Sequence, residues 1–286
     1  MNPKPQQTKQ LTRRTVKTVA ETLKPNEIFE LIHKREPIYA IGNQRFHTIR
    51  DRALMALCFL TGGRITEVVG GKQYHRFHTH DKIVEVVGSK QRYHYPAEDK
   101  VETKAIGRHP GLTITNLEVS EDFLTINSMA IVKRSPQIIQ RYGPHIAQRS
   151  QLRFPLKRKL YKNKFRDQLV PFSWLVMEYL YQLEDQNKTS TDTKLFPFQD
   201  TRAWQIINNY TDKFPNYFRV QTERFYGYYI FKDFMVHSKF MGKVNPMSSA
   251  PYIRFTDDSD IKDLNKIMDF KWIDSTVAEI KAHIKL

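Results

Sequence analysis

Apolar residues recur at helical spacing in several parts of the chain. Ile28, Leu31 and Ile32 share one helical face just after Pro25, and proline suits the first turn of a helix. Residues 49–60 are apolar around most of a helical circumference, so we expect a buried, central helix there. Further helices are predicted over residues 172–183, 203–210, 261–268 and 275–284.

Two glycines and a serine mark expected helix boundaries. Gly62 and Gly63 follow Thr61 and are expected to end the central helix, because glycine accepts the left-handed conformation of a helix stop. Ser275 is expected to cap the last helix, since its hydroxyl can accept a hydrogen bond from a backbone N–H of the first turn.

Shorter stretches show the patterns typical of strands. Residues 82–87 form a strand candidate inside residues 71–110, a stretch rich in His, Lys and Tyr that we interpret as an insertion. Residues 111–135 alternate over short runs, which favours short strands. The predicted fold is mainly α with a small antiparallel β-sheet (α+β), in a domain over residues 24–286. Residues 1–23 are polar and basic and are predicted to form a flexible arm.

Composition narrows the class of protein. The chain has 286 residues, of which 40% are hydrophobic and 12% aromatic, enough for a substantial core. No run of eighteen apolar residues is present, so we expect no membrane span. The first residues contain no apolar signal core, and Cys58 is the single cysteine, placed inside an apolar helical run. These features predict a cytoplasmic protein without disulfides and a buried thiol that acts as a small hydrophobic residue.

The charge of the chain indicates a polyanionic partner. Lysine and arginine number 46 against 30 acidic residues, which gives a formal net charge of +16. Such an excess favours nucleic acid, through neutralisation of phosphates. Residues 149–166 contain no acidic residue and interleave cations with apolar and aromatic anchors, typical of a folded basic face. The candidate DNA-binding residues are Arg149, Arg153, Lys157, Arg158, Lys159, Lys162, Lys164 and Arg166.

Arg64 is the first candidate for phosphate chemistry. It follows the predicted central helix and its glycine turn, and a new helix is expected to start directly after it. A planar guanidinium suits bidentate binding of phosphate oxygens. The alternative is a structural ion pair between Arg64 and Glu67.

The segment Thr61-Gly62-Gly63-Arg64-Ile65-Thr66-Glu67 resembles the first arginine motif of the tyrosine recombinases (the phage integrase family), in which an apolar helix precedes Thr-Gly-x-Arg-x-Ser/Thr-Glu. Other segments resemble this family in the same order along residues 24–286. They are the strand at 111–118, the hairpin lysine region at 131–134, the strand exits at 153–156 and 169–171, the Leu-Phe-Pro at 195–197, the His-x-x-Arg box at 214–219 and the last box at 267–283.

The resemblance implies a recombinase catalytic-domain fold and a set of site residues. Arg64 and Arg219 would be the two arginines that stabilise the pentavalent phosphate. Lys133 would protonate the leaving 5′ oxygen as general acid. Asn216 occupies the histidine place, and Trp272 occupies the His/Trp place, where an indole N–H can donate to a phosphate oxygen. The implied activity is metal-independent and cofactor-free transesterification of double-stranded DNA in integration or site-specific recombination.

The nucleophile position departs from the family pattern. The family's tyrosine would follow Trp272 by nine residues, where this chain has Lys281. Asn216 also differs, because an amide cannot shuttle a proton. Four interpretations stay open: a degenerate recombinase that holds DNA without cutting it, a tyrosine supplied by another protomer, a misaligned tail, or a rearranged tyrosine, for which the candidates are Tyr226, Tyr228, Tyr229 and Tyr252.

Several partners and rival functions follow from the same residues. Two dozen residues precede the first predicted helix, where most relatives carry a core-binding domain that closes on DNA. Two interpretations stay open: the basic arm wraps DNA weakly, or a partner supplies that domain. The rival function is a non-catalytic accessory protein that binds duplex DNA, and preferential RNA binding would indicate a third class. His78 and His80 alternate on a possible strand, but no Cys or carboxylate cluster completes a zinc site. Residues 225–231 are aromatic and are expected to pack in the core rather than to stack on bases.

Overall fold

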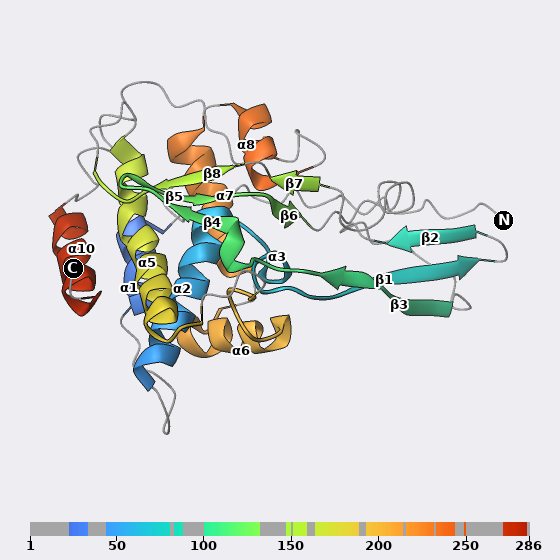
Figure 1. Ribbon diagram of the computed structural model, residues 1–286. Coiled ribbons are helices and arrows are strands. Elements are labelled where there is room, and N and C mark those ends of the chain that lie inside the picture. Colours follow the sequence, from blue (N-terminus) through green and yellow to red (C-terminus); the bar gives the residue numbers. More distant parts are fainter. Residues whose placement is uncertain are drawn as a thin grey trace.

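The structure is a computed structural model that describes residues 23–33, 44–80, 83–87, 100–131, 147–149, 151–158, 164–188, 193–213, 216–231, 233–243, 249 and 271–284. Helices gather into one body around α2, short strands cover one side of it, and a longer β-ribbon extends away from it (Figure 1).

The predicted central helices are present. Helix α1 spans Pro25–His33 and α2 spans Gln44–Thr61, so α2 begins five residues before the predicted start. Ile28 and Ile32 on α1 are fully buried, and α2 is buried continuously from Ala53 to Leu60. Helix α5, Val170–Asp185, packs along α2 and confirms the helix predicted over 172–183. The apolar periodicity therefore located the core correctly.

Smaller helices surround this core. Helix α3 covers Ile65–Val69, α6 covers Asp200–Thr211 and confirms the face predicted over 203–210, and α7 covers Tyr217–Phe225. A π-helical turn, η4, follows at Tyr226–Ile230, and α8 runs from Phe234 to Met241. Tyr226, Tyr228 and Tyr229 belong to the hydrophobic core, as predicted for residues 225–231.

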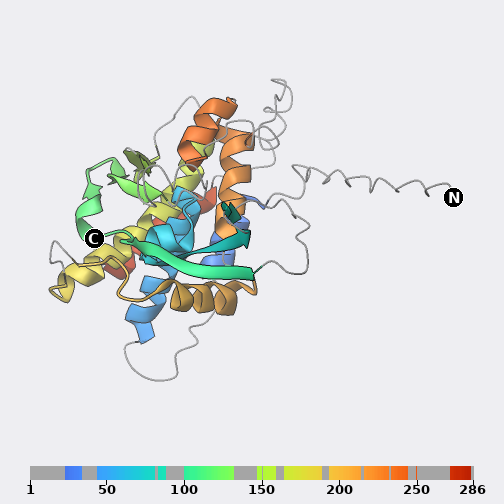
Figure 2. The same cartoon turned by 90° about the vertical axis from the view of Figure 1, so that its right-hand side faces the viewer.

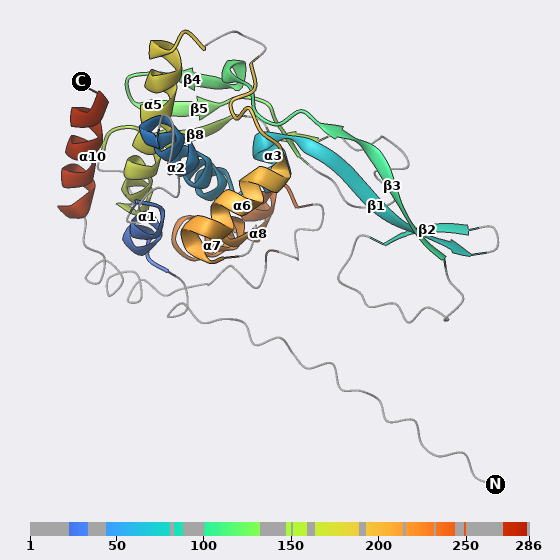
Figure 3. The same ribbon diagram turned by 90° about the horizontal axis from the view of Figure 1, so that it is seen from below.

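The last helix starts earlier than predicted. Helix α10 spans Lys271–Ile284, and Ser275 lies inside it, where its hydroxyl donates 3.0 Å to the carbonyl oxygen of Trp272. Ser275 is therefore not a cap. Helix α10 packs on α5, on the side of the body away from the β-ribbon (Figures 1 and 3). The helix predicted over 261–268 lies outside the described residues.

Short antiparallel strands cover one side of the helices. Strands β4 (Leu117–Val119), β5 (Phe123–Ile126) and β8 (Leu152–Pro155) form a sheet in the order β4-β5-β8. Strand β6 (Met129–Ile131) pairs with β7 (Ala147–Arg149). The strands predicted within 111–135 are thus present. Two stretches form 3-10 turns instead: η2, Ile114–Asn116, inside the segment matched to a family strand, and η3, Lys164–Leu169, before α5.

The stretch interpreted as an insertion forms a β-ribbon. Strand β1 (Gly71–His80) pairs antiparallel with β2 (Ile83–Val87) on one side and with β3 (Lys100–His109) on the other. Only β2 was predicted. The ribbon leaves the body next to α3 and α6, and Figures 1 and 2 both place α6 beside its base.

Antiparallel strands beside a mainly helical body make this an α+β fold. No helix in the described ranges has both the length and the apolar character needed to cross a bilayer. The arm predicted over residues 1–23 lies almost wholly outside the described residues, which begin at Leu23.

Candidate functional site

The candidate site begins at the tight turn between α2 and α3. The Thr61 hydroxyl donates 2.6 Å to the carbonyl oxygen of Leu57 and accepts 3.0 Å from the backbone N–H of Gly63. Gly62 has a positive φ of 57°, so it is the left-handed stop that the sequence predicted. This turn places Arg64 directly before the first residue of α3.

Arg64 and Glu67 form a two-point contact. The backbone N–H of Arg64 donates 2.7 Å to one carboxylate oxygen of Glu67, and Nη1 of Arg64 donates 2.8 Å to the other. Glu67 is fully buried, whereas the Arg64 side chain is 24% exposed. The structural ion pair considered from the sequence is therefore present, and it leaves part of the Arg64 side chain accessible to solvent.

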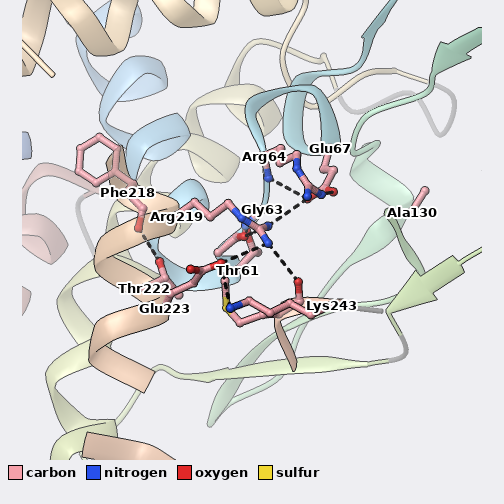
Figure 4. A network of polar contacts seen from close by, with 12 residues as sticks. Thr61, Gly63, Arg64, Glu67, Ala130, Phe218, Arg219, Thr222, Glu223 and Lys243 are labelled. Carbon is pink, nitrogen blue, oxygen red and sulfur yellow. Dashed lines mark hydrogen bonds and ion pairs between the residues drawn. The ribbon is translucent and has the colours of Figure 1, made fainter. Parts of the chain in front are cut away.

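Arg219 reaches the same carboxylate from α7. Its Nη1 donates 2.7 Å to the carbonyl oxygen of Gly62 and lies 3.9 Å from Oε2 of Glu67. Its Nη2 lies 3.4 Å from Oε1 of Glu223, one helical turn further along α7. Figure 4 shows the Arg219 side chain extending from α7 toward the α2–α3 turn. The two arginines of the matched motifs thus meet around Glu67.

Lys243 adds a third cation. Its ammonium lies 3.6 Å from Oε1 of Glu223, the carboxylate that also pairs with Arg219. Burial lowers the pKa of Lys243, and the nearby charges of Arg219 and Arg64 lower it further, while Glu223 opposes this shift. Three cations therefore surround two buried or nearly buried carboxylates, Glu67 and Glu223. We call these five residues the arginine cluster.

His237 joins α8 to α7 beneath the arginine cluster. It is fully buried, and its Nε2 lies 3.0 Å from the carbonyl oxygen of Glu223. A carbonyl only accepts, so Nε2 carries the proton and donates. Burial, together with the charge of Lys243, lowers the pKa of His237 to about 4, so the ring is neutral near pH 7. His237 therefore supports the cluster without adding charge.

An open pocket borders the exposed side of Arg64. Its volume is about 290 Å³, and its lining combines the start of α3, the start of α6 and the residue before α7. Asn216 and Trp204 are both exposed there, so Arg64 and Asn216, predicted to act together, border one pocket. The full lining is Arg64, Ile65, Thr66, Asp200, Thr201, Trp204 and Asn216.

Trp272 lies apart from this cluster. Its indole N–H donates 3.0 Å to Oε1 of Gln168, and its ring contacts Phe29 with a centroid distance of 5.4 Å. Phe29 packs on Phe172, which packs on Phe59 in α2. Helices α1, α5 and α2 therefore separate Trp272 from the arginines, and its indole N–H serves a buried glutamine.

Lys281 is also remote from the arginine cluster. Its ammonium lies 4.5 Å from the centre of the Trp174 ring, an arrangement that suits a cation–π contact between α10 and α5. The residue at the position expected for the nucleophile thus packs α10 against α5.

Three of the alternative tyrosines, Tyr226, Tyr228 and Tyr229, are core residues. Tyr226 stacks on Phe240 at 4.3 Å between centroids, and Tyr229 lies 5.1 Å from Phe165. Burial raises the pKa of Tyr229, which disfavours the phenolate needed for attack. Tyr252 lies outside the described residues. Lys133 also lies outside the described residues, two positions after the end of β6 at Ile131.

Some cations of the predicted basic face pair with acidic residues. Lys157 pairs with Glu121, and Arg158 pairs with Asp274 at 2.5 Å. Arg153 on β8 and Arg166 on η3 are exposed. Arg149 lies in β7 and Lys164 in η3, but their side chains are outside the description, as are Lys159 and Lys162 altogether.

Sequence reasoning missed Glu223 and Lys243. Glu223 could have been found, because an acid four residues after Arg219 on a helix is placed for an ion pair. Lys243 has no comparable signal, since only the packing of α8 against α7 brings it to Glu223.

Two other candidates from the sequence are the thiol of Cys58 and the histidine pair His78 and His80. Cys58 is buried, and burial raises the pKa of its thiol to about 12, so it acts as a hydrophobic residue as predicted. His78 and His80 lie in β1, but their side chains are outside the description. No cluster of three or more potential metal ligands occurs among the residues searched, which are those described.

Comparison of the chain with protein-family models, with curated proteins and with solved structures found no match.

Proposed function

We propose that this chain binds duplex DNA and holds a backbone phosphate at the arginine cluster, as a protein similar to the catalytic domain of tyrosine recombinases. One observation carries the proposal. Arg64 and Arg219, taken from two motifs far apart in the sequence, meet at the same carboxylate beside the Thr61-Gly62-Gly63 turn.

The charge balance of the cluster supports an anionic ligand. With Lys243 protonated, its three cations exceed its two carboxylates by one charge. Arg64 is the cation that reaches solvent, and Asn216 beside the same pocket can donate a hydrogen bond to a phosphate oxygen. Arg219 and Lys243 would act from behind Arg64 by holding the carboxylates and by contributing positive potential. Double-stranded DNA also suits the net charge of +16.

We further propose that the chain acts in DNA integration or recombination, with strand cleavage dependent on a nucleophile beyond the residues described. In this proposal, Lys133 remains the general acid that the resemblance implies, and Lys243 is a second lysine near the phosphate.

A specific observation favours the alternative, a non-catalytic DNA-binding accessory protein. Lys281 packs on Trp174, and Tyr226, Tyr228 and Tyr229 are buried in the core. None of these three tyrosines therefore stands ready to attack a phosphate at Arg64.

Two measurements test these functions together. Binding to a labelled duplex should weaken steeply with salt, and Arg64→Ala should weaken it further, while Lys188→Gln at the exposed end of α5 should have little effect. A suicide duplex, denatured after incubation, should yield a covalent adduct if the chain cleaves DNA. Salt-sensitive binding without an adduct would support the accessory function, and an absence of salt-sensitive binding would refute both.

A further inference from the structure

A second cleft lies on the face formed by β5, β8, η3 and the η4–α8 region. Its volume is about 360 Å³, at the lower end of the range of roughly 300–1,000 Å³ found for small-molecule sites. Its walls combine aromatic rings and arginines, among them Arg153, Arg166, Tyr226, Phe231 and Phe240.

One wall of this cleft is a stack of aromatic rings. Tyr226 and Phe240 are stacked with centroids 4.3 Å apart, and Phe231 lies 5.4 Å from Tyr226 and 5.2 Å from Phe240. Phe231 and Phe240 are only partly buried, although they pack against the hydrophobic core. The core therefore holds these rings in place while part of their surface faces the cleft.

Two arginines supply positive charge at the same cleft. Arg153 comes from β8 and Arg166 from η3, and both side chains are exposed. Neither guanidinium pairs with an acid in the described part of the chain, in contrast to Lys157 and Arg158, which face Glu121 and Asp274. The cleft thus combines an apolar, aromatic wall with guanidinium groups that can bind an anion.

The cleft adjoins the arginine cluster through the end of α8. Phe240 lines the cleft, and the carbonyl oxygen of the next residue, Met241, lies 3.4 Å from Nη2 of Arg219. Lys243 follows two residues later and belongs to the cluster. The backbone of α8 therefore connects one wall of the cleft to the arginine cluster.

We propose that this cleft binds a single unpaired nucleotide, with its base against the ring wall and its phosphate at Arg153 and Arg166. Aromatic rings bind bases through their faces, and a base exposes its face only when it leaves the stack of the duplex. The volume admits one nucleotide, and the arginines would recognise its phosphate. This inference rests on the proposed binding of DNA and adds to it a preference for distorted or partly single-stranded sites.

The test compares three nucleic acid probes with the full chain. One probe is a matched duplex, the second is the same duplex with one unpaired 2-aminopurine nucleotide, and the third is a short single strand that contains 2-aminopurine. We expect the bulged duplex to bind about tenfold more tightly than the matched duplex, a size that one stacked base can supply. The fluorescence of 2-aminopurine should fall on binding, because stacking quenches it.

Variants locate the effect in the cleft. The double variant Arg153→Gln, Arg166→Gln should reduce the preference for the bulged duplex to about one, and Phe240→Leu should abolish the quenching while it keeps an apolar side chain. Lys188→Gln is a control for the loss of an exposed cation, because Lys188 lies just beyond the C-terminal end of α5 and outside the cleft lining. It should change neither the preference nor the quenching. Circular dichroism and thermal unfolding test whether each variant remains folded.

The outcomes separate this inference from the proposed function. Equal, salt-sensitive binding of both duplexes would overturn the cleft inference and leave duplex binding intact. Weak duplex binding, with quenching of the single strand that depends on Arg153 and Arg166, would support the cleft and refute the duplex function. A preference or quenching that survives the cleft variants would overturn the inference, and so would the absence of quenching with both 2-aminopurine probes.

Discussion

Nη1 of Arg219 donates a 2.7 Å hydrogen bond to the carbonyl oxygen of Gly62, 157 positions earlier in the chain. The bond joins α7 to the turn between α2 and α3. The same guanidinium approaches Glu67 and Glu223, so it holds two buried or nearly buried carboxylates as well as the turn. Arg219 is therefore expected to matter for stability as well as for DNA binding.

Replacing Arg219 tests the first of these roles. Arg219→Ala would remove one of the two cations at each of two buried or nearly buried carboxylates, Glu67 and Glu223, and removal of one partner from a buried ion pair costs about 3–5 kcal/mol. Arg219→Lys should cost less, because the charge remains while the fork of donors is lost. Urea unfolding measures both changes. Arg158→Ala is the control, since its pair with Asp274 is 37% and 69% exposed and should contribute less than about 1 kcal/mol. Equal losses for Arg219→Ala and Arg158→Ala would contradict this prediction.

Gly62 is expected to tolerate no side chain. Its φ of 57° is left-handed, which costs an L-residue roughly 1–2 kcal/mol, and a Cβ there would lie 2.7 Å from Cε of Met241. Gly62→Ala should therefore lower the free energy of unfolding by more than the backbone term alone. The excess should shrink in a Met241→Ala background, because the Met241 side chain is shortened while Cγ2 of Thr222, 3.0 Å from the same Cβ, remains. A double-mutant cycle by urea unfolding measures the excess, and a coupling energy near zero would rule out the steric part.

Lys243 should give the site an unusual alkaline pH dependence. Its pKa is lowered from 10.5 in the folded chain, mainly by burial. Between the lowered pKa and 10.5 the unfolded chain binds more protons at this residue than the folded chain. The cost of burying the charged lysine therefore applies below the folded pKa and is relieved as pH rises through this window. Relative to Lys243→Met, the wild-type chain should become more stable over the same range.

DNA affinity should respond in the opposite direction. Deprotonation of Lys243 removes one cation from the arginine cluster, so DNA affinity should fall. Because the pKa of Lys243 is lowered, this fall should occur at a lower pH than the deprotonation of an ordinary lysine would produce. Lys243→Arg stays charged throughout and should keep a flatter profile. Fluorescence anisotropy at fixed salt measures both proteins. Parallel profiles for wild type and Lys243→Arg would exclude a role for Lys243 in the positive potential of the site.

The sequence predicted the helical core well because burial there follows helical periodicity. Ile28 and Ile32 on α1, and the continuous apolar run of α2, leave little choice of face. The ribbon of β1 and β3 was missed for the opposite reason. Its strands extend from the body, and Gly71–His80 and Lys100–His109 consist mostly of polar residues without the apolar alternation that predicts a strand.

The candidate site divides in a similar way. The sequence located Arg64 and its turn because a tight helix stop needs local residues, here Gly62. It could not place Lys243 beside Glu223, because that contact depends on how α8 packs on α7. Trp272 matched a motif by local sequence alone, and the packing of α10 on α5 determined its neighbours.

Trp272→Phe distinguishes the motif-based role of this residue from its structural one. The indole N–H donates to Gln168, which is 1% exposed and whose amide nitrogen has no partner among the described residues. Loss of the donor would leave the Gln168 amide without a described partner at either end, which costs about 1–3 kcal/mol. The ring of phenylalanine would preserve the contact with Phe29. We therefore expect a lower unfolding midpoint in urea with DNA affinity unchanged at a temperature where the variant is folded. If Trp272 instead contacts a phosphate, as the family resemblance implies, DNA affinity would fall while stability changed little, and the described position of α10 would not be the one that binds DNA.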